Sequence, residues 1–202
     1  MTSFESIYLA SQSPRRRQLL EQIGVRNELL LAGPEEDAEA LEAVIEGEAP
    51  EVYCARVTEA KLDAALKRLV ARGLPVMPIL CSDTTVALDQ LILGKPVDAE
   101  DALRTLTQLA GRRHRVITAV AVGLGEKRAS ALSISEVDFA AVDAVRLRRY
   151  VESGEPFGKA GSYAIQSEAA TWISRISGSY SGIMGLPLYE TAQLLKQFDV
   201  RF

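Results

Sequence analysis

The residue of this chain best placed for chemistry is Asp83, which follows an apolar run at 76–81 and lies among the hydroxyl side chains of Ser82, Thr84 and Thr85. The run predicts a buried strand, and the ligands of open α/β sheets bind where such strands end. Asp83 is therefore the first candidate for the chemistry of the site. The alternative is a simple turn, because Asp and Ser often start turns by bonding to their own backbone.

Three consecutive arginines, residues 15–17, lie where a helix is expected to begin. Ser13 suits the N-cap and Pro14 the first helical position, which predicts a helix over 14–23 that ends at Gly24. A helix N-terminus carries partial positive charge and prefers anions, so the arginines oppose the helix dipole. This conflict suggests that phosphate binds there, on backbone N–H groups and guanidinium groups together. The alternative is a solvated basic face.

Two lysines lie between residues that restrict or free the backbone. Lys95 is held between Gly94 and Pro96, a setting that can fix a point charge on a phosphate, although an exposed turn lysine is the alternative. Lys159 has glycines close on both sides, which would let the backbone approach a ligand. An apolar stretch follows and ends at Gln166, whose amide can read the edge of a base.

Caps, turns and apolar periodicity predict the elements that position these residues. Strands are expected over 7–10, 28–32, 76–81, 115–122, 129–139, 162–166 and 172–176, a hairpin joins 85–88 to 91–93, and helices are expected over 14–23, 50–72, 99–110, 143–150 and 185–198. The strands at 115–122 and 129–139 should form a long antiparallel pair. The acidic stretch at 35–48 lacks apolar periodicity and is expected to be a mobile loop.

Length and composition limit the classes of protein that fit. With 202 residues, 48% of them hydrophobic, the chain can form one large domain over 1–202 or two lobes sharing a sheet. It has no apolar run of membrane-spanning length and no signal-peptide pattern, so we expect a cytoplasmic protein that does not bind membranes. A net charge of −4 argues against a protein that coats a nucleic acid polymer.

The cysteines and the single histidine argue against a zinc or disulfide protein. Cys54 lies in a helical pattern and Cys81 in a buried strand, so both are expected to be reduced core thiols. His114 has neither a second histidine nor a nearby cysteine. A hydrogen-bonded structural imidazole is therefore favoured over a zinc ligand or a member of a Ser-His-Asp triad.

Six motifs, in order and over nearly the whole chain, resemble those of the Maf family, the septum-formation-inhibitor-like nucleotide pyrophosphatases. They are LASQSPRR at 9–16, SDTTV at 82–86, GKP at 94–96, GRRHRVIT at 111–118, KAGSYAIQ at 159–166 and GLPL at 185–188. The resemblance implies an α/β fold related to inosine triphosphatase, with a long twisted mixed sheet, flanking helices and an active cleft between two lobes. It also suggests a homodimer, although the sequence is equally compatible with a monomer.

The activity that the resemblance implies is hydrolysis of nucleoside triphosphates to the monophosphate and pyrophosphate, with a divalent cation, Mg²⁺ or Mn²⁺. Asp83 would accept the proton of the attacking water and, with Glu36, hold the cation. Arg15, Thr84 and Gln166 would influence the choice of substrate. The other residues expected to line the cleft are Ser11, Arg16, Lys61, Lys95 and Lys159.

Arg15, directly after the Ser-Pro pair, resembles the dTTP/UTP branch of the family, whereas the branch acting on 7-methylguanosine triphosphate more often has tryptophan there. Gln166 agrees, because an amide can donate to and accept from the imide edge of uracil or thymine. Two alternatives remain. One is a nucleotide-binding regulator of cell division with decayed catalysis, motivated by Gly158 and Ser167 where the family usually has Asp and Gly; the other is a pyrophosphatase for modified nucleotides.

Overall fold

The computed structural model describes residues 3–202 as one mixed β-sheet with helices on both faces. The strands are β1 (Ile7–Leu9), β2 (Asn27–Leu29), β3 (Ile79–Leu88), β4 (Leu91–Leu93), β5 (Arg113–Leu124), β6 (Lys127–Phe139) and β7 (Ile173–Ser177). The α-helices are α1 (Pro14–Gln22), α2 (Pro50–Ala71), α3 (Ala99–Leu109), α4 (Ala144–Glu152), α5 (Tyr180–Met184) and α6 (Leu188–Gln197). Short 3₁₀ helices are η1 (Ala40–Glu42), η2 (Ala160–Ser162) and η3 (Glu168–Trp172).

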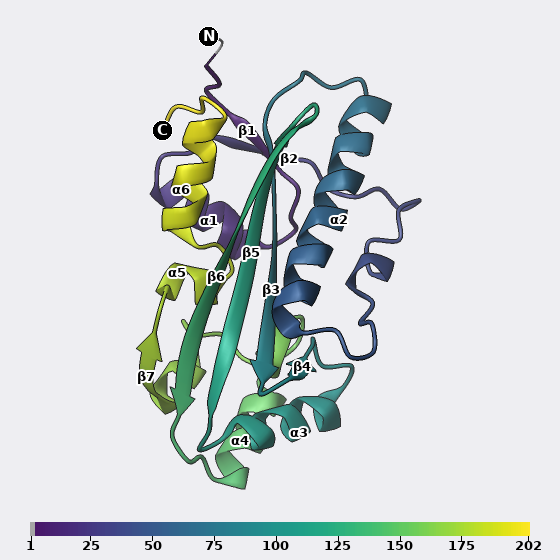
Figure 1. Cartoon of the computed structure of the whole chain (residues 1–202). Helices are drawn as coiled ribbons and strands as arrows, with labels where there is room; N and C mark the ends of the chain where they lie inside the picture. Colours follow the sequence, from purple (N-terminus) through teal and green to yellow (C-terminus); the bar gives the residue numbers. More distant parts are fainter. Residues whose placement is uncertain (1–2) are drawn as a thin grey trace.

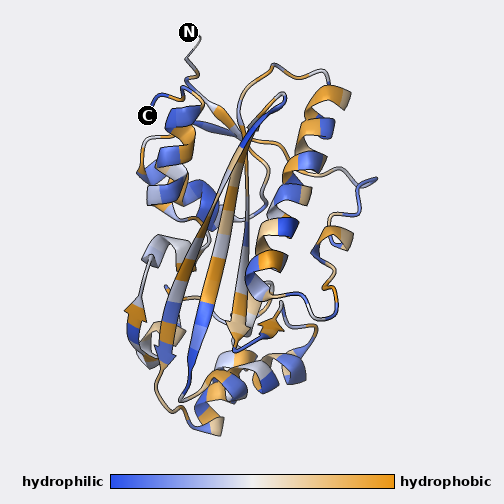
Figure 2. Cartoon of the chain, in the orientation of Figure 1, coloured by the Kyte–Doolittle hydropathy of each residue, from blue (hydrophilic) through white to orange (hydrophobic). Residues whose placement is uncertain are grey.

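The sheet has the strand order β2-β1-β3-β5-β6-β7, with β4 paired to the far end of β3 (Figure 1). β1 is parallel to both of its neighbours, and the pairs from β3 onward are antiparallel. The long β5–β6 hairpin turns at Gly125, whose φ of +59° favours glycine. Its tip is hydrophilic, whereas hydrophobic residues concentrate along the middle of β5 (Figure 2).

Alternate residues of β3 face the two sides of the sheet, and each side is covered by helices. On one side Ile79 and Cys81 pack with Leu62 and Leu69 of α2. On the other side Leu80 packs with residues of α1 and α6. Because both faces are covered, nearly the whole of β3 is buried, as expected for a strand in the middle of an α/β sheet.

The other face of the sheet carries two separate hydrophobic cores, which define two lobes. The first core joins β1, α1 and α6 near the chain termini. The second joins α3, α4 and the opposite ends of β3, β5 and β6, with Trp172 and Tyr150 at its centre. In Figure 1 the helices α1 and α6 lie at one end of the sheet and α3 and α4 at the other. The predicted α/β fold with a mixed sheet in two lobes is confirmed.

Most predicted elements are confirmed, and the errors have physical reasons. The strand predicted over 76–81 in fact runs from Ile79 to Leu88, because the β-branched residues Thr84, Thr85 and Val86 continue it. Asp83 therefore lies in the middle of a strand, not at its end. No strand forms at 162–166, where the end of η2, which contains Gly161, is followed by irregular backbone and a turn. The short helix α5 was missed in a segment rich in glycine and serine.

Both cysteines are buried free thiols, as predicted, and burial raises the pKa of Cys54 and of Cys81 to about 12. They are therefore inert packing residues at neutral pH. Among residues 3–202, no helix is both long enough and apolar enough to span a bilayer.

Candidate active site

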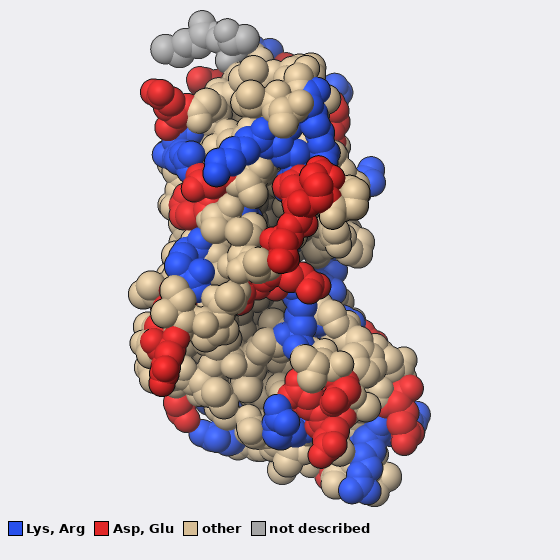
Figure 3. All heavy atoms as spheres, turned by 90° about the vertical axis from the view of Figure 1, so that its right-hand side faces the viewer, with Lys and Arg blue, Asp and Glu red and all other residues tan. Residues whose placement is uncertain are grey.

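A cavity of about 560 Å³ opens between the two lobes. Figure 3 shows it as a hollow bordered by acidic and basic side chains. Nine of the ten residues predicted for the site line it, and they come from the β1–α1 loop, α1, α2, β3 and the loops around 95 and 158–166. They are Ser11, Arg15, Arg16, Lys61, Asp83, Thr84, Lys95, Lys159 and Gln166.

The cavity reaches Asp83 through a gap in the pairing of β3. β1 pairs with β3 only as far as Leu80, and β4 begins to pair at Val86. Residues 82–85 therefore have a neighbour strand, β5, on one side only. Because this edge is open, Asp83 on one face of the sheet and Thr84 on the other both reach the cavity. The strand that ends at the ligand site is thus the parallel strand β1, and Asp83 lies beside its end.

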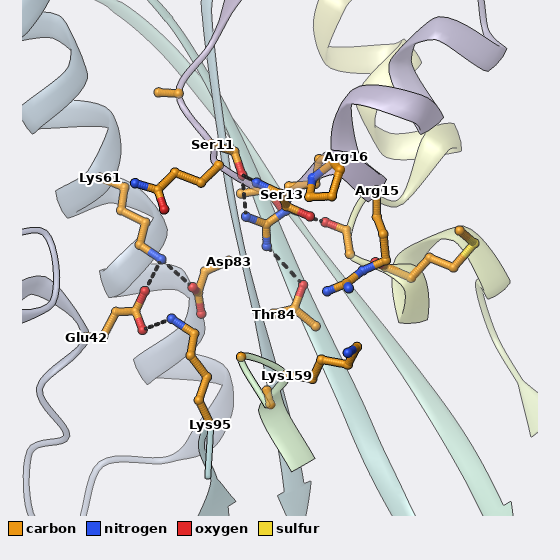
Figure 4. A pocket seen from close by; sticks show the side chains of 18 of the residues that line it. Ser11, Ser13, Arg15, Arg16, Glu42, Lys61, Asp83, Thr84, Lys95 and Lys159 are labelled. Atoms are coloured by element: carbon orange, nitrogen blue, oxygen red, sulfur yellow. Dashed lines mark hydrogen bonds and ion pairs between the residues drawn. The ribbon is translucent and has the colours of Figure 1, made fainter. Parts of the chain in front are cut away.

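Asp83 is held in place by an ammonium group and a hydroxyl group. Its Oδ1 accepts a hydrogen bond of 2.6 Å from Lys61 Nζ (Figure 4). Its Oδ2 accepts one of 3.4 Å from Thr85 Oγ1. The residue is only 8% exposed. A carboxylate at the wall of a cavity, paired on one side and accessible on the other, can accept a proton from water or bind a hard cation.

Lys61 joins Asp83 to a second carboxylate, that of Glu42. Lys61 Nζ lies 2.8 Å from Glu42 Oε1, and Lys95 Nζ lies 2.7 Å from Glu42 Oε2. Burial alone would lower the pKa of Lys61, but the Asp83 and Glu42 carboxylates outweigh it and raise that pKa. The Lys61 ammonium group therefore stands charged beside Asp83, where phosphate oxygens can bind it.

Arg16 connects the β1–α1 loop to the sheet and to the end of α5. Its guanidinium group donates to Ser11 Oγ at 3.1 Å, to Thr84 Oγ1 at 3.3 Å and to the carbonyl of Gly185 at 2.8 Å. The neighbouring Arg15 donates to the carbonyl of Met184 at 3.3 Å. α1 thus directs its first two arginines into the cavity, and the third predicted arginine pairs on the surface with an acid of α1. Ser13 occupies the N-cap position, but its side chain makes no cap hydrogen bond.

The loop that carries Lys159 and Gln166 packs directly on β3. At Gly161 φ is +69°, and a Cβ there would lie 2.8 Å from the Val86 side chain. The Gly161 N–H donates to the carbonyl of Gly94 at 3.1 Å, which joins this loop to the turn that carries Lys95. Both predicted glycine–lysine motifs are therefore parts of one wall of the cavity. In the view of Figure 4, Arg15 and Lys159 lie on one side of Asp83 and Lys95 on the other.

His114 is a structural imidazole, as predicted. Its Nε2 lies 2.7 Å from the hydroxyl of Tyr163, and its ring packs edge-on against Phe139. Burial lowers the pKa of His114 to about 4, so the ring is neutral at pH 7. Because Tyr163 lines the cavity, this pair supports the loop from behind.

Glu36 is not placed where the resemblance suggested. Its carboxylate accepts hydrogen bonds of 2.7 and 2.6 Å from Arg68 and one of 3.0 Å from the Gly33 N–H. The hydrogen bonds from Arg68 and Gly33 lower the pKa of Glu36 to about 2. Glu36 does not line the cavity and shares no contact with Asp83. The acid that reaches the Asp83 cluster is Glu42, which sequence reasoning missed because the acidic stretch has no periodicity.

The donor set fits a divalent cation. Between residues 3 and 202 no group of three or more His, Cys, Asp or Glu side chains is arranged to hold a metal alone. However, Mg²⁺ is commonly held by one or two carboxylates together with substrate phosphates. The ammonium of Lys61 already stands between two carboxylate oxygens, those of Asp83 and Glu42, as a cation would.

The two departures from the usual motifs do not disturb the cavity. Gly158 has a φ of +72°, a conformation in which glycine is favoured over aspartate. Ser167 bonds through its hydroxyl to the Ala164 carbonyl at 2.8 Å and lies 3.1 Å from the hydroxyl of Tyr150. Both therefore serve the local backbone, and neither change gives a reason for lost catalysis.

A two-lobed α/β fold with Asp83 and six cationic side chains around one cavity is the arrangement of a protein that binds polyphosphate. The chain belongs to the Maf family: the family model for Maf-like proteins matches residues 6–198. The resemblance seen in the six motifs is thereby confirmed.

Curated relatives match over nearly their full length. The dTTP/UTP pyrophosphatase of Albidiferax ferrireducens is 61% identical, with 98% of each chain covered. That of Burkholderia lata is 62% identical, with 98% of this chain and 96% of the relative covered. A solved structure, the nucleoside-triphosphatase (dITP/XTP pyrophosphatase) of Mycobacterium abscessus, overlaps 68% of this chain and 75% of its own at 19% identity, with a TM-score of 0.41.

Proposed function

We propose that this protein hydrolyses nucleoside triphosphates, with dTTP and UTP as preferred substrates, to the monophosphate and pyrophosphate. The observation that carries the proposal is the position of Asp83, at an open strand edge with cationic side chains on both sides. The names of relatives at 61–62% identity support the same reaction and substrates.

Asp83 is the general base in this mechanism. Hydrolysis between the α and β phosphates needs a water aligned with the α phosphorus and a group that takes its proton. The hydrogen bonds from Lys61 and Thr85 fix the carboxylate, so that one proton-accepting oxygen faces the cavity. Lys61, bonded to Asp83, would also neutralise charge that develops on the α phosphate.

The remaining cations hold the phosphate chain and the leaving pyrophosphate. Arg15, Arg16, Lys95 and Lys159 all line the cavity, and guanidinium and ammonium groups bind phosphate oxygens by charge-assisted hydrogen bonds. A divalent cation, Mg²⁺ or Mn²⁺, would be held by Asp83 and by phosphate oxygens of the substrate. When bound, it neutralises phosphate charge and lowers the pKa of a bound water.

Base selection is assigned to Gln166, with Arg15 and Thr84 shaping the same pocket. Gln166 is exposed at the wall of the cavity, so its amide is available to the imide edge of a pyrimidine, to which it can both donate and accept. Glu36 could join the cation only if its ion pair with Arg68 opened.

The test is a panel of triphosphates assayed for released pyrophosphate, with wild-type protein and the Asp83→Asn variant. Asparagine keeps the shape of the side chain but cannot accept the proton, so turnover should fall by a factor of about 10²–10⁴ while thermal unfolding changes little. Undiminished pyrophosphate release from dTTP or UTP by the variant would refute the role of Asp83. Preference for 7-methylguanosine triphosphate, or binding without hydrolysis, would favour the alternatives named above.

Two further expectations stay predictions. The mass of one chain is 21.9 kDa, and light scattering of a homodimer would give twice that mass. A cytoplasmic location would appear on fractionation of the source cells.

A further inference from the structure

Glu42 forms ion pairs with two of the cationic side chains that the proposed reaction needs. Its two carboxylate oxygens bind Lys61 and Lys95 separately, at 2.8 and 2.7 Å. Lys61 and Lys95 come from α2 and from the turn after β4, and among residues 3–202 only Glu42 is bonded to both. A carboxylate that spans two ammonium groups uses the same donors that two neighbouring phosphate oxygens would use.

The backbone of Glu42 is held by side chains of α2, whereas its carboxylate is held by the two lysines. The Tyr53 hydroxyl donates to the Glu42 carbonyl at 2.8 Å, and Arg56 donates to the Ala43 carbonyl at 2.9 Å. Arg56 also holds Glu48 through two hydrogen bonds of 2.7 Å. α2 thereby anchors η1 beside the cavity, while the Glu42 side chain, 27% exposed, has solvent on one side.

The charges around Glu42 explain why it binds there. Asp83 neutralises only one of the two ammonium groups, and Glu42 neutralises the second. Burial raises the pKa of Glu42, but Lys61 and Lys95 outweigh this effect, so that the pKa lies below its usual value and the carboxylate is ionised. A polyphosphate that enters the cavity brings several negative charges to the same lysines. Like charges so close repel each other strongly, so Glu42 and the polyphosphate compete for them.

We propose that Glu42 is a built-in competing anion, which covers Lys61 and Lys95 in the empty site and which the phosphate chain of the substrate must displace. The inference rests on the proposed function and adds a regulatory contact to its site. Glu42 therefore weakens the binding of polyphosphate and returns to the lysines when pyrophosphate leaves.

The test is the affinity for inorganic pyrophosphate, measured by calorimetry in EDTA and again in excess Mg²⁺. The Glu42→Gln variant should bind pyrophosphate about fivefold to tenfold more tightly than wild type in both buffers, because a partly exposed carboxylate no longer competes. The matched control is Glu46→Gln, which removes the same charge from the same loop at an exposed position without an ion pair among the described residues. It should leave the affinity unchanged.

A second variant separates reach from charge. Glu42→Asp keeps the negative charge but is one methylene shorter, so it should span the two lysines less well and also tighten binding. Unchanged affinity in Glu42→Gln, or an equal change in Glu46→Gln, would overturn the proposal. So would weaker binding by Glu42→Gln confined to Mg²⁺, because Glu42 would then hold the cation.

The affinity measurement needs no turnover, so the two proposals fail separately. If wild-type protein binds pyrophosphate but hydrolyses no triphosphate, the proposed function fails and the Glu42 comparison still stands. If it hydrolyses dTTP and the variants bind pyrophosphate equally, only the role of Glu42 fails.

Discussion

Replacing His114 by glutamine should make the stability of the protein less sensitive to acid. His114 is 2% exposed and bonds to the Tyr163 hydroxyl at 2.7 Å. Its burial lowers the pKa of the imidazole to about 4 in the folded state, whereas the unfolded chain titrates near the ordinary value of 6.5. Glutamine keeps a polar group near Tyr163 and does not titrate, so the comparison isolates the protonation of one ring.

The size and sign of the effect follow from these two pKa values. Between pH 6.5 and about 4 the unfolded chain binds a proton that the folded chain does not. The contribution of the neutral His114 ring to the unfolding free energy is therefore fully present above pH 6.5 and is lost as the pH falls toward 4. Integrated from pH 7 to pH 5, the loss is about 2 kcal/mol of unfolding free energy. The variant should lack this part of the acid sensitivity, whatever its stability at pH 7.

The assay is urea unfolding at several pH values from 7 to 5, followed by the fluorescence of Trp172, the single tryptophan, which is 1% exposed in the fold. Other acids with lowered pKa, such as Glu36, destabilise both proteins alike as the pH falls, so the difference between the two curves is read. Parallel curves for wild type and variant would refute the burial argument.

Two further predictions concern the walls of the cavity. Gly161→Ala should lower the unfolding free energy by about 2–4 kcal/mol, because φ is +69° and the added Cβ would meet a β3 side chain at 2.8 Å. In thermal melts, Gly125→Ala is the control, with positive φ but open space, and should cost only about 1 kcal/mol; equal losses would contradict the steric argument. Arg16→Lys should raise KM for dTTP about tenfold, because lysine cannot replace the guanidinium fork. An unchanged KM would place Arg16 outside substrate binding.

Local chemistry predicted much of the fold. Asp98 and Asp143 were expected to cap helices, and each side chain accepts a hydrogen bond from a backbone N–H of α3 or α4. The hairpin around Gly125 was expected from turn residues between two apolar runs. These features depend on neighbours in the sequence, which is why patterns of residues reveal them.

Features that depend on distant partners were beyond reach. The residues next to Glu36 and Glu42 do not indicate which of the two pairs with Arg68 and which with Lys61. Both basic residues lie on α2, and the pairing is set only when the loop packs against that helix. In the same way, the open edge beside Asp83 arises because β1 stops pairing before β4 begins. No local pattern records where a neighbouring strand stops.

The unbroken course of β3, β5 and β6 from one lobe to the other limits how this protein can respond to its ligand. A sheet of three long strands resists bending across its hydrogen bonds, so the lobes cannot swing like the jaws of a hinged enzyme. Adjustment to an incoming nucleotide then falls to the side chains that border the cavity, such as those of Glu42 and Lys159. The backbone around the cavity therefore stays rigid while side chains rearrange. Turnover should depend on how fast these side chains release the product.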